Sequence, residues 1–425
     1  MKKLVCMLLA ILMAVSMIAV ASADSAPKKI SLISRYAETD NITYVLKTLT
    51  DEYNALNPDK QVELELNIVP ATDEVILVNA ASGDIPDIML CAFVPTIRTL
   101  ASMDMICDME ELFAQAGVTD CVSDTLFAEV AAQQNTEKCW SMPSCLAIEG
   151  FWYHMDLFKQ AGIEAAPTTM EEFEEDCDKL LAAGILPWAF CGCDYPVDRQ
   201  IQALSERLGG PEFAIGMDNG NQNWSNETVY KAMNKLLEWD KKGYWGPGIT
   251  TVDKNTMISM FNERQAAMTY YSTNGSSLFS KYENNFGEVG FFPYPTWESE
   301  GGVGKITDYP ATYGWIWCVS KAAVDEAFLD WFGYVMPRYG DTALNDIQLI
   351  TPFKYDEKLT EDVGWFAKVH LEELEKVGDT FNVLCINMPS EVYNDLRANE
   401  QLMLLGEMTP EEVCKTVDDG FIMYE

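Results

Sequence analysis

Segments with the pattern of strands and segments with the pattern of helices alternate through the first hundred residues. Residues 29–34 and 62–68 alternate side chains as strands do, and residues 88–92 form a short apolar run typical of a buried strand. Between them, residues 45–56 and 74–82 carry apolar side chains at helical spacing. Since strands joined through helices usually pair in parallel, this order predicts an α/β lobe built on a largely parallel sheet.

The rest of the chain continues the alternation less regularly. Further strands are predicted at residues 185–190, 266–271, 289–292 and 313–319, and mainly helix at residues 321–425. Residues 209–226 and 293–310 are rich in glycine, proline or asparagine and are predicted to be long loops.

Residues 150–173 predict a strand, a helix, a turn at Pro167 and the start of a second helix in unbroken succession. Thr168 or Thr169 is placed to cap the second helix, each with a glutamate three residues later for a capping box. Because this unit follows the first α/β lobe, its strand is expected to enter a second lobe. Residues 143–149, just before it, are therefore hinge candidates.

The N-terminal residues have the pattern of a secretory signal peptide. Lys2 and Lys3 precede an apolar run that ends in Ala21-Ser22-Ala23, which predicts export with cleavage after Ala23. The cysteine in this stretch, Cys6, lies near its beginning, so no lipobox follows the apolar run. We expect a periplasmic location or an association with the outside of the cell.

Charge and length limit the classes of function. Without residues 1–23 the chain carries 27 basic and 66 acidic groups, a net charge of −39. A field of this sign repels phosphate backbones, which argues against a nucleic-acid partner. About 400 residues exceed what one hydrophobic core usually supports, so two domains are expected.

A search for chemical signatures finds no catalytic or metal-binding motif. Nucleophile-elbow, zinc-protease and phosphate-loop motifs are absent from the sequence. Eleven cysteines follow the signal peptide, an odd number, and several lie on apolar helix stripes as small core residues do. With two histidines, His154 and His370, the chain predicts no metal site, and we expect no cofactor.

Aromatic residues are abundant near the predicted ends of strands. Trp140, Trp188, Trp315 and Trp317 all lie there, and ligands of open α/β sheets bind outside the carboxyl ends of strands. An indole ring stacks on the apolar face of a sugar while neighbouring polar groups bond its hydroxyls. For each tryptophan alone, simple packing in a core is an equal alternative.

ASGDIPDI at residues 81–88 is a short segment that resembles one found in the extracellular solute-binding proteins of carbohydrate ABC importers, the family that includes maltose-binding protein. YHMDLFKQAG at residues 153–162 is also similar, with His154 in the usual place of asparagine. Further matches in the family's order are APTTMEEF at 166–173, the segment 261–269, GFFPYP at 290–295, and Tyr313-Gly314-Trp315 followed by Val319-Ser320-Lys321.

The resemblance implies the two-lobed α/β fold of type II periplasmic binding proteins, with a hinge and a ligand cleft between the lobes. It implies a signal peptide at residues 1–23, a first lobe from 24–143 plus about 296–350, and a second lobe from 144–295 plus about 351–425. Hinge bending would close the lobes on a carbohydrate and present them to the permease subunits of an ABC transporter. The implied protein is a monomer and not an enzyme.

The same resemblance places the ligand-binding residues. In the first lobe the loops after the strands offer Arg35, Tyr36, Asp40 and Phe93. In the second lobe the resemblance places Trp188, Asp194, Tyr195, Tyr271, Asn274 and Trp315 where family members have stacking aromatic residues or polar sugar contacts.

Two other functions are compatible with the sequence. A secreted glycoside hydrolase would need a pair of carboxylates across the cleft, and 66 acidic residues offer many candidate pairs. The same fold could instead bind a non-sugar solute such as a polyamine or a peptide.

Overall fold

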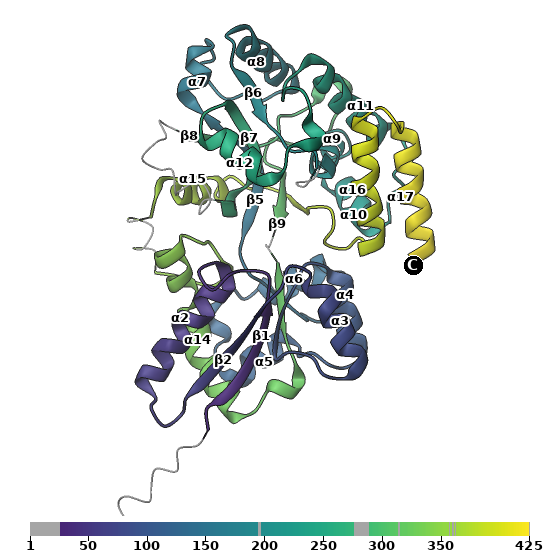
Figure 1. Ribbon diagram of the computed structural model, residues 1–425. Helices are drawn as coiled ribbons and strands as arrows, with labels where there is room; N and C mark the ends of the chain where they lie inside the picture. Colours follow the sequence, from purple (N-terminus) through teal and green to yellow (C-terminus); the bar gives the residue numbers. More distant parts are fainter. Residues whose placement is uncertain are drawn as a thin grey trace, which may run out of the picture.

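The computed structural model describes residues 26–424 except 194–196, 276–288, 313–314, 357, 359–360 and 362. Its strands form two separate sheets, each covered by helices, and the two resulting lobes lie one above the other in Figure 1. The lobe that contains the N-terminal strand is called the first lobe here, and the other is called the second lobe. The predicted α/β organisation in two lobes is confirmed.

The sheet of the first lobe has the strand order β2-β1-β3-β10-β4. β1 pairs in parallel with the strands on both of its sides: Leu32 of β1 lies opposite Leu66 of β2 and Ile88 of β3. β10 pairs antiparallel with β3 and β4. The strands span β1 Lys28–Ser34, β2 Val62–Ile68, β3 Ile88–Cys91, β4 Met142–Pro143 and β10 Ile316–Val319. The first three strands confirm the sequence prediction.

The helices of the first lobe bury part of their side chains in the cores on the two sides of this sheet. α2 and α14 lie side by side, and Trp331 of α14 donates a hydrogen bond to the hydroxyl of Thr50 on α2 at 3.0 Å. Both side chains are buried, so this bond satisfies an indole N–H within the core. The helices span α2 Asn41–Leu56, α3 Thr72–Ser82, α4 Val94–Ser102, α5 Met109–Ala116, α6 Leu126–Gln133 and α14 Glu326–Ile347.

The sheet of the second lobe has the order β11-β9-β5-β7-β6, with β8 also paired to β5. β5 is buried along nearly its whole length and places successive aromatic side chains on opposite faces. Phe151 packs in one core and Trp152 in the other, and neither is exposed to solvent. The strands span β5 Ala147–His154, β6 Leu186–Ala189, β7 Ala266–Ser272, β8 Val289–Phe292, β9 Tyr309–Thr312 and β11 Thr380–Asn382.

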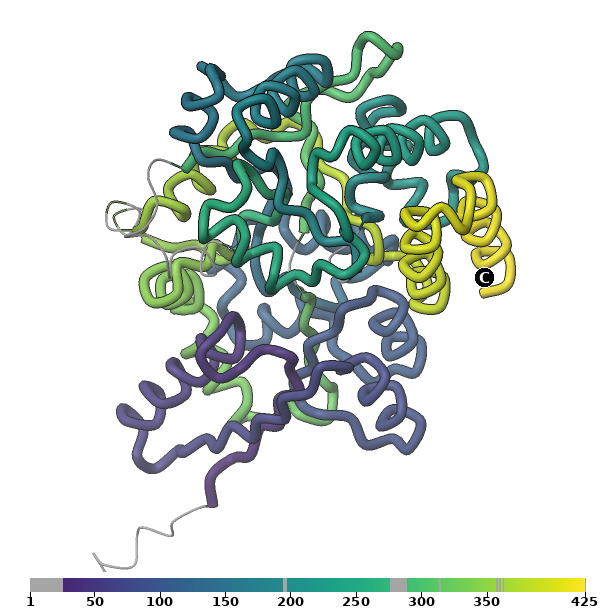
Figure 2. The backbone as a smooth tube through the Cα atoms, turned by 45° about the horizontal axis from the view of Figure 1, so that its top comes forward, coloured from purple at the N-terminus to yellow at the C-terminus, as the bar shows by residue number. Residues whose placement is uncertain are grey.

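The helices of the second lobe include the predicted capped one, α8. The side chain of Thr169 accepts a hydrogen bond from the backbone N–H of Glu172, and the Glu172 side chain bonds back to the cap residue. Figure 2 shows the two C-terminal helices against the outer helices of this lobe. The helices span α7 Met155–Gln160, α8 Met170–Ala182, α9 Val197–Gly209, α10 Pro211–Asn219, α11 Glu227–Lys242, α12 Lys254–Asn262, α15 Trp365–Leu374, α16 Ser390–Leu404 and α17 Pro410–Tyr424.

One loop prediction was wrong, and a second was correct except at its C-terminal end. Residues 209–226 contain α10, which begins at Pro211 and ends before Gly220. Proline in the first turn of a helix and a left-handed glycine after its last residue mark helix boundaries. The same two residue types raise the glycine and proline content of the segment, which is why its composition suggested a loop. The predicted loop at 293–310 ends in β9, whose Pro310 pairs with β11.

The chain passes between the lobes at points that the sheets define. Residues 144–146 connect β4 of the first sheet to β5 of the second, within the segment predicted as a hinge. Since β9 belongs to the second sheet, the return to the first sheet follows Thr312, later than the expected residue 296. A third passage follows α14, where the backbone N–H of Leu146 donates to the carbonyl of Ile350 at 2.9 Å.

Candidate functional site

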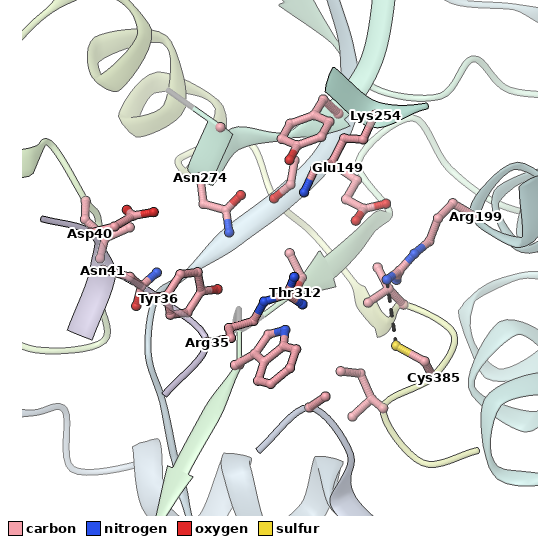
Figure 3. A pocket seen from close by; sticks show the side chains of 18 of the residues that line it. Arg35, Tyr36, Asp40, Asn41, Glu149, Arg199, Lys254, Asn274, Thr312 and Cys385 are labelled. Atoms are coloured by element: carbon pink, nitrogen blue, oxygen red, sulfur yellow. Dashed lines mark hydrogen bonds between the residues drawn. The ribbon is translucent and has the colours of Figure 1, made fainter. Parts of the chain in front are cut away.

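A cavity of about 410 Å³ lies between the two lobes (Figure 3). Its first-lobe wall begins where the parallel strands β1 and β3 end, at Arg35 and Ala92. Its opposite wall comes from β5, β7 and the helices α9 and α12. It is lined by Arg35, Tyr36, Ala37, Asp40, Asn41, Ala92, Glu149, Arg199, Lys254, Tyr271, Ser272, Asn274, Gly275, Thr312, Trp315, Ile347, Leu349, Val383, Cys385 and Ile386.

The loop after β1 is held rigidly beneath the cavity. The backbone N–H of Tyr36 donates to the hydroxyl of Ser34 at 3.0 Å, and the Thr43 hydroxyl donates to the Tyr36 carbonyl at 3.2 Å. The guanidinium carbon of Arg35 lies 4.5 Å from the centre of the Trp315 ring, a cation–π contact. These contacts place the Arg35 cation over the Trp315 ring in the cavity wall.

Hydrogen-bonding groups of β5 and β7 face this wall. Glu149 of β5 is paired in register with Ser272 of β7, and its side chain is almost fully buried. Asn274 follows β7 and donates to the sulfur of Cys145 at 3.4 Å. The carboxylate, amide and phenol groups on this side suit the recognition of hydroxyl groups.

Arg199 reaches the cavity from the first turn of α9. Its Nη2 lies 3.8 Å from the sulfur of Cys385, and none of the described residues accepts a hydrogen bond from its Nε or Nη1, which are buried. Burial lowers the pKa of this guanidinium, but Glu149 and other nearby groups outweigh it and hold the pKa well above its ordinary value. Arg199 is therefore a permanent cation at the cavity wall.

Residues 382–387 form the end of the cavity and contact both lobes. Gln202 of the second lobe accepts a hydrogen bond from the backbone N–H of Leu384 at 2.9 Å. On the other side, the N–H of Val94 in the first lobe donates to the carbonyl of Ile386 at 2.9 Å. Cys385 between them has a φ of 88°, a left-handed conformation uncommon for a residue with a side chain. The segment is thus fixed from both lobes.

Six of the predicted binding residues are brought together in the cavity lining: Arg35, Tyr36, Asp40, Tyr271, Asn274 and Trp315. Phe93 is outside the lining, because its ring packs against that of Tyr393 with centroids 6.3 Å apart, although its neighbour Ala92 lines the cavity. Asp194 and Tyr195 lie outside the described residues.

The expectation that Trp188 stacks on a ligand is corrected. Its side chain has no exposure and packs against the rings of Phe151 and Phe190, each with centroids 4.9 Å apart. Trp188 stands inside β6 and points into the core of the second lobe, whereas Trp315 stands just before β10 and lines the cavity.

Sequence reasoning missed Glu149, Arg199 and Lys254. Glu149 interrupts an otherwise apolar strand, and a charged residue at such a position is a signal for a functional site. Arg199 and Lys254 occupy the first turns of α9 and α12, where nothing in the local pattern separates them from surface cations.

The described residues contain neither a cluster suited to a metal ion nor a helix suited to cross a membrane. No group of three or more histidine, cysteine, aspartate or glutamate side chains in this part of the chain is placed to hold a metal ion. No helix in the same residues combines the length and apolar character needed to cross a membrane.

Comparison with known proteins supplies the family. Residues 37–333 match the family of bacterial extracellular solute-binding proteins. No curated protein sequence matches the chain. Several solved structures share the fold at low sequence identity, and they show that the architecture is the two-lobed α/β fold of type II periplasmic binding proteins.

One of these structures is a chitin oligosaccharide binding protein, with 20% identity and a TM-score of 0.77, the match covering 94% of this chain and 99% of that one. Another is the maltose-bound MalE3 of T. maritima, with 17% identity and a TM-score of 0.72 over 94% and 100% of the two chains. A third is RafE in complex with raffinose, with 17% identity and a TM-score of 0.69 over 92% and 98%. Because the sequence match extends over more than half of its length, this chain belongs to the family of bacterial extracellular solute-binding proteins.

Proposed function

We propose that this protein captures a sugar or oligosaccharide in the cavity between its lobes and delivers it to the permease of an ABC transporter. One observation carries the proposal: an aromatic ring, Trp315, lines the same cavity as planar polar side chains from both lobes. Stacking on the ring and hydrogen bonds to hydroxyls are the two interactions that a sugar requires. The names of similar structures, which mention chitin oligosaccharide, maltose and raffinose, support this ligand class.

Ligand contacts to both lobes provide the mechanism. Arg35 and Trp315 belong to the first lobe, while Glu149 and Arg199 belong to the second. A ligand that contacts all four residues binds more tightly when the lobes are closed. It therefore shifts the population toward the closed form. A permease that recognises the closed form would then respond only to loaded protein. Residues 144–146 are proposed as part of the hinge.

A binding assay with a built-in test for turnover checks the proposal. Pure protein is screened by thermal shift against neutral and acidic oligosaccharides, amino acids and polyamines. A ligand present at 100 times its Kd should stabilise the protein by about 2.7 kcal/mol. The same mixtures are analysed for hydrolysis products, since we propose that the protein is not an enzyme. A shift with polyamines alone, or turnover of a glycan, would contradict the proposal.

We further propose that the protein is exported and acts as a monomer. The signal-peptide pattern, with cleavage expected after Ala23, and the extracellular family support export. Intact mass spectrometry of protein from the outside of the cell should give a chain that begins at Asp24. Analytical ultracentrifugation should give the mass of one chain.

A further inference from the structure

The charge balance of the cavity is the reverse of that of the whole protein. The chain has 66 acidic and 29 basic residues, more than two acids for each base. Among the residues that the structure describes, the cavity is lined by three bases, Arg35, Arg199 and Lys254, and by two acids, Asp40 and Glu149. Bases therefore outnumber acids in the lining of the cavity, although acids outnumber bases in the chain.

These cations converge on the space where a ligand would lie. Figure 3 shows Arg35, Arg199 and Lys254 extending toward the middle of the cavity from three different elements. Asp40 lies at the side away from Arg199. Glu149 is therefore the acid that lies among the cations, and it balances one of them.

The buried polar group behind Arg199 adds no balancing charge. It contains Arg397 and two carboxyl groups, Asp198 and Glu400. Burial raises the pKa of Asp198 to about 6 and raises that of Glu400 well above its ordinary value. Asp198 faces both Arg199 and Arg397. Asp218, which also faces Arg199, has Arg98 beside it. Each of these two carboxyl groups therefore has a cation outside the cavity lining to balance it, so the excess positive charge of the lining remains.

A neutral sugar would leave this excess uncompensated. Closing the lobes removes water from the cations, and a desolvated cation without a counter-charge is costly. A carboxylate on the ligand removes that cost and accepts charge-assisted hydrogen bonds, for which the fork of a guanidinium is well shaped. The buried Nε and Nη1 of Arg199, without an acceptor among the described residues, are suitable donors.

We propose that the sugar bound in this cavity is acidic and that its carboxylate lies between Arg35, Arg199 and Lys254. This inference rests on the proposed function and narrows its ligand class to oligosaccharides that contain hexuronic acid. A single carboxylate matches the excess of one positive charge in the lining. A phosphate ester, with a charge of about −1.5 to −2 at neutral pH, exceeds it.

Calorimetry with matched ligands tests the inference. The full mature protein is titrated with di- and trisaccharides of galacturonic and glucuronic acid, with the corresponding galactose and glucose oligosaccharides, and with the hexose 6-phosphates. The acidic oligosaccharides should bind at least tenfold more tightly than their neutral counterparts and more tightly than the phosphates. Raising NaCl from 20 to 300 mM should weaken the acidic ligands more than the neutral ones, because salt screens charge attraction.

A variant at Lys254 separates charge recognition from general damage to the site. Lys254→Met should reduce the preference for the acidic over the neutral ligand by roughly tenfold, as expected for the loss of one charge-assisted contact. Lys415→Met is the matched control, since Lys415 is highly exposed and lies on α17 outside the cavity lining. It should leave the preference unchanged. Thermal unfolding confirms that both variants are folded.

The outcomes distinguish this inference from the proposed function. If neutral oligosaccharides bind as tightly as the acidic ones, or if Lys254→Met leaves the preference intact, the inference is wrong and the sugar-binding function stands. Tighter binding of the phosphates would also overturn it. If no sugar binds at all, the proposed function and this inference are overturned together.

Discussion

The guanidinium group of Arg35 lies over the indole ring of Trp315, with its central carbon 4.5 Å from the centre of the ring. The two residues come from the two separate stretches of sequence that form the first lobe, one just after β1 and the other just before β10. Both residues line the same cavity, so the ring and the N–H donors of the guanidinium group border one space. The strength of this coupling and its part in binding can be measured.

Replacing Trp315 should weaken ligand binding without unfolding the protein. Trp315→Leu removes the flat surface, and loss of a stacked aromatic contact should cost about 1.4 kcal/mol or more, at least a tenfold increase in Kd. The melting temperature should change little, since the residue is only half-buried. Trp365→Leu is the control, because Trp365 is 47% exposed on α15 outside the cavity lining. If Trp315→Leu and Trp365→Leu bind the ligand with equal affinity, the placement of Trp315 in the binding site is wrong.

The Arg35–Trp315 contact should appear as a coupling energy in a double-mutant cycle. Arg35→Ala, Trp315→Leu and the double variant are each titrated with the same ligand. A cation–π pair at a partly exposed site contributes roughly 0.5–2 kcal/mol, so the losses in binding free energy should not add. Strict additivity would show that the two residues act independently. Arg35→Lys keeps the charge but loses the planar stacking, and it should fall between wild type and Arg35→Ala.

Replacing Trp188 should have the opposite effect. Trp188→Ala leaves a large cavity among five aromatic rings of the second-lobe core, and such a change costs about 3–5 kcal/mol of unfolding free energy. Urea unfolding measures this loss. In the protein that stays folded, ligand affinity should remain within about twofold of wild type. A large loss of affinity with little loss of stability would show that Trp188 contacts the ligand, and it would contradict the placement of this residue in the core.

Asp218 predicts a dependence of stability on pH. Its carboxylate accepts hydrogen bonds from the backbone and side chain of Asn387, but burial outweighs them and raises its pKa to about 7. Its charge is otherwise faced by Arg98 and Arg199. Between pH 4 and 7 the folded protein retains a proton that the unfolded chain releases. The contribution of Asp218 to stability is therefore complete at low pH and is lost as the pH rises toward 7.

The variant Asp218→Asn isolates this contribution. It keeps an oxygen acceptor for Asn387 and removes the titrating proton. Between pH 4.5 and 7.5 the unfolding free energy of the wild type should decrease by a few kcal/mol more than that of the variant. Asp198 and Glu206, whose pKa values are raised in the same direction by burial, contribute equally to both proteins. Parallel curves for the two proteins would refute this role for Asp218.

Most of the fold followed from local patterns. The period-two segments became β1 and β2, and the threonine-glutamate spacing at Thr169 and Glu172 became an observed capping box. Predictions from local composition were wrong where glycine and proline, which are common in loops, mark the ends of a helix instead. Pro211 and Gly220 suggested a loop by their content but mark the two ends of α10 by their positions. β9 was missed because its few residues, including Pro310, become a strand only through partners distant in sequence.

The binding residues were predicted in part, and the reason is geometric. Arg35 and Tyr36 follow a clearly patterned parallel strand, and the end of such a strand is known to face a cleft. Whether a tryptophan near a strand end faces a core or a cleft depends on the pleat and on the helices that cover it, as the contrast between Trp188 and Trp315 shows. Arg199 and Lys254 required the tertiary arrangement of α9 and α12, which no local pattern contains.

The position of β10 between β3 and β4 also constrains when the protein can fold. β3 ends at Cys91, and the strand that pairs with it begins at Ile316. A chain emerging from a ribosome or a translocation pore therefore cannot complete its first sheet until three quarters of its length has appeared. Pairings this distant in sequence form slowly, because a long loop must close before they contribute stability. The first lobe comes first in the sequence, yet the completion of its sheet must wait until the larger part of the second lobe, up to β9, has been made.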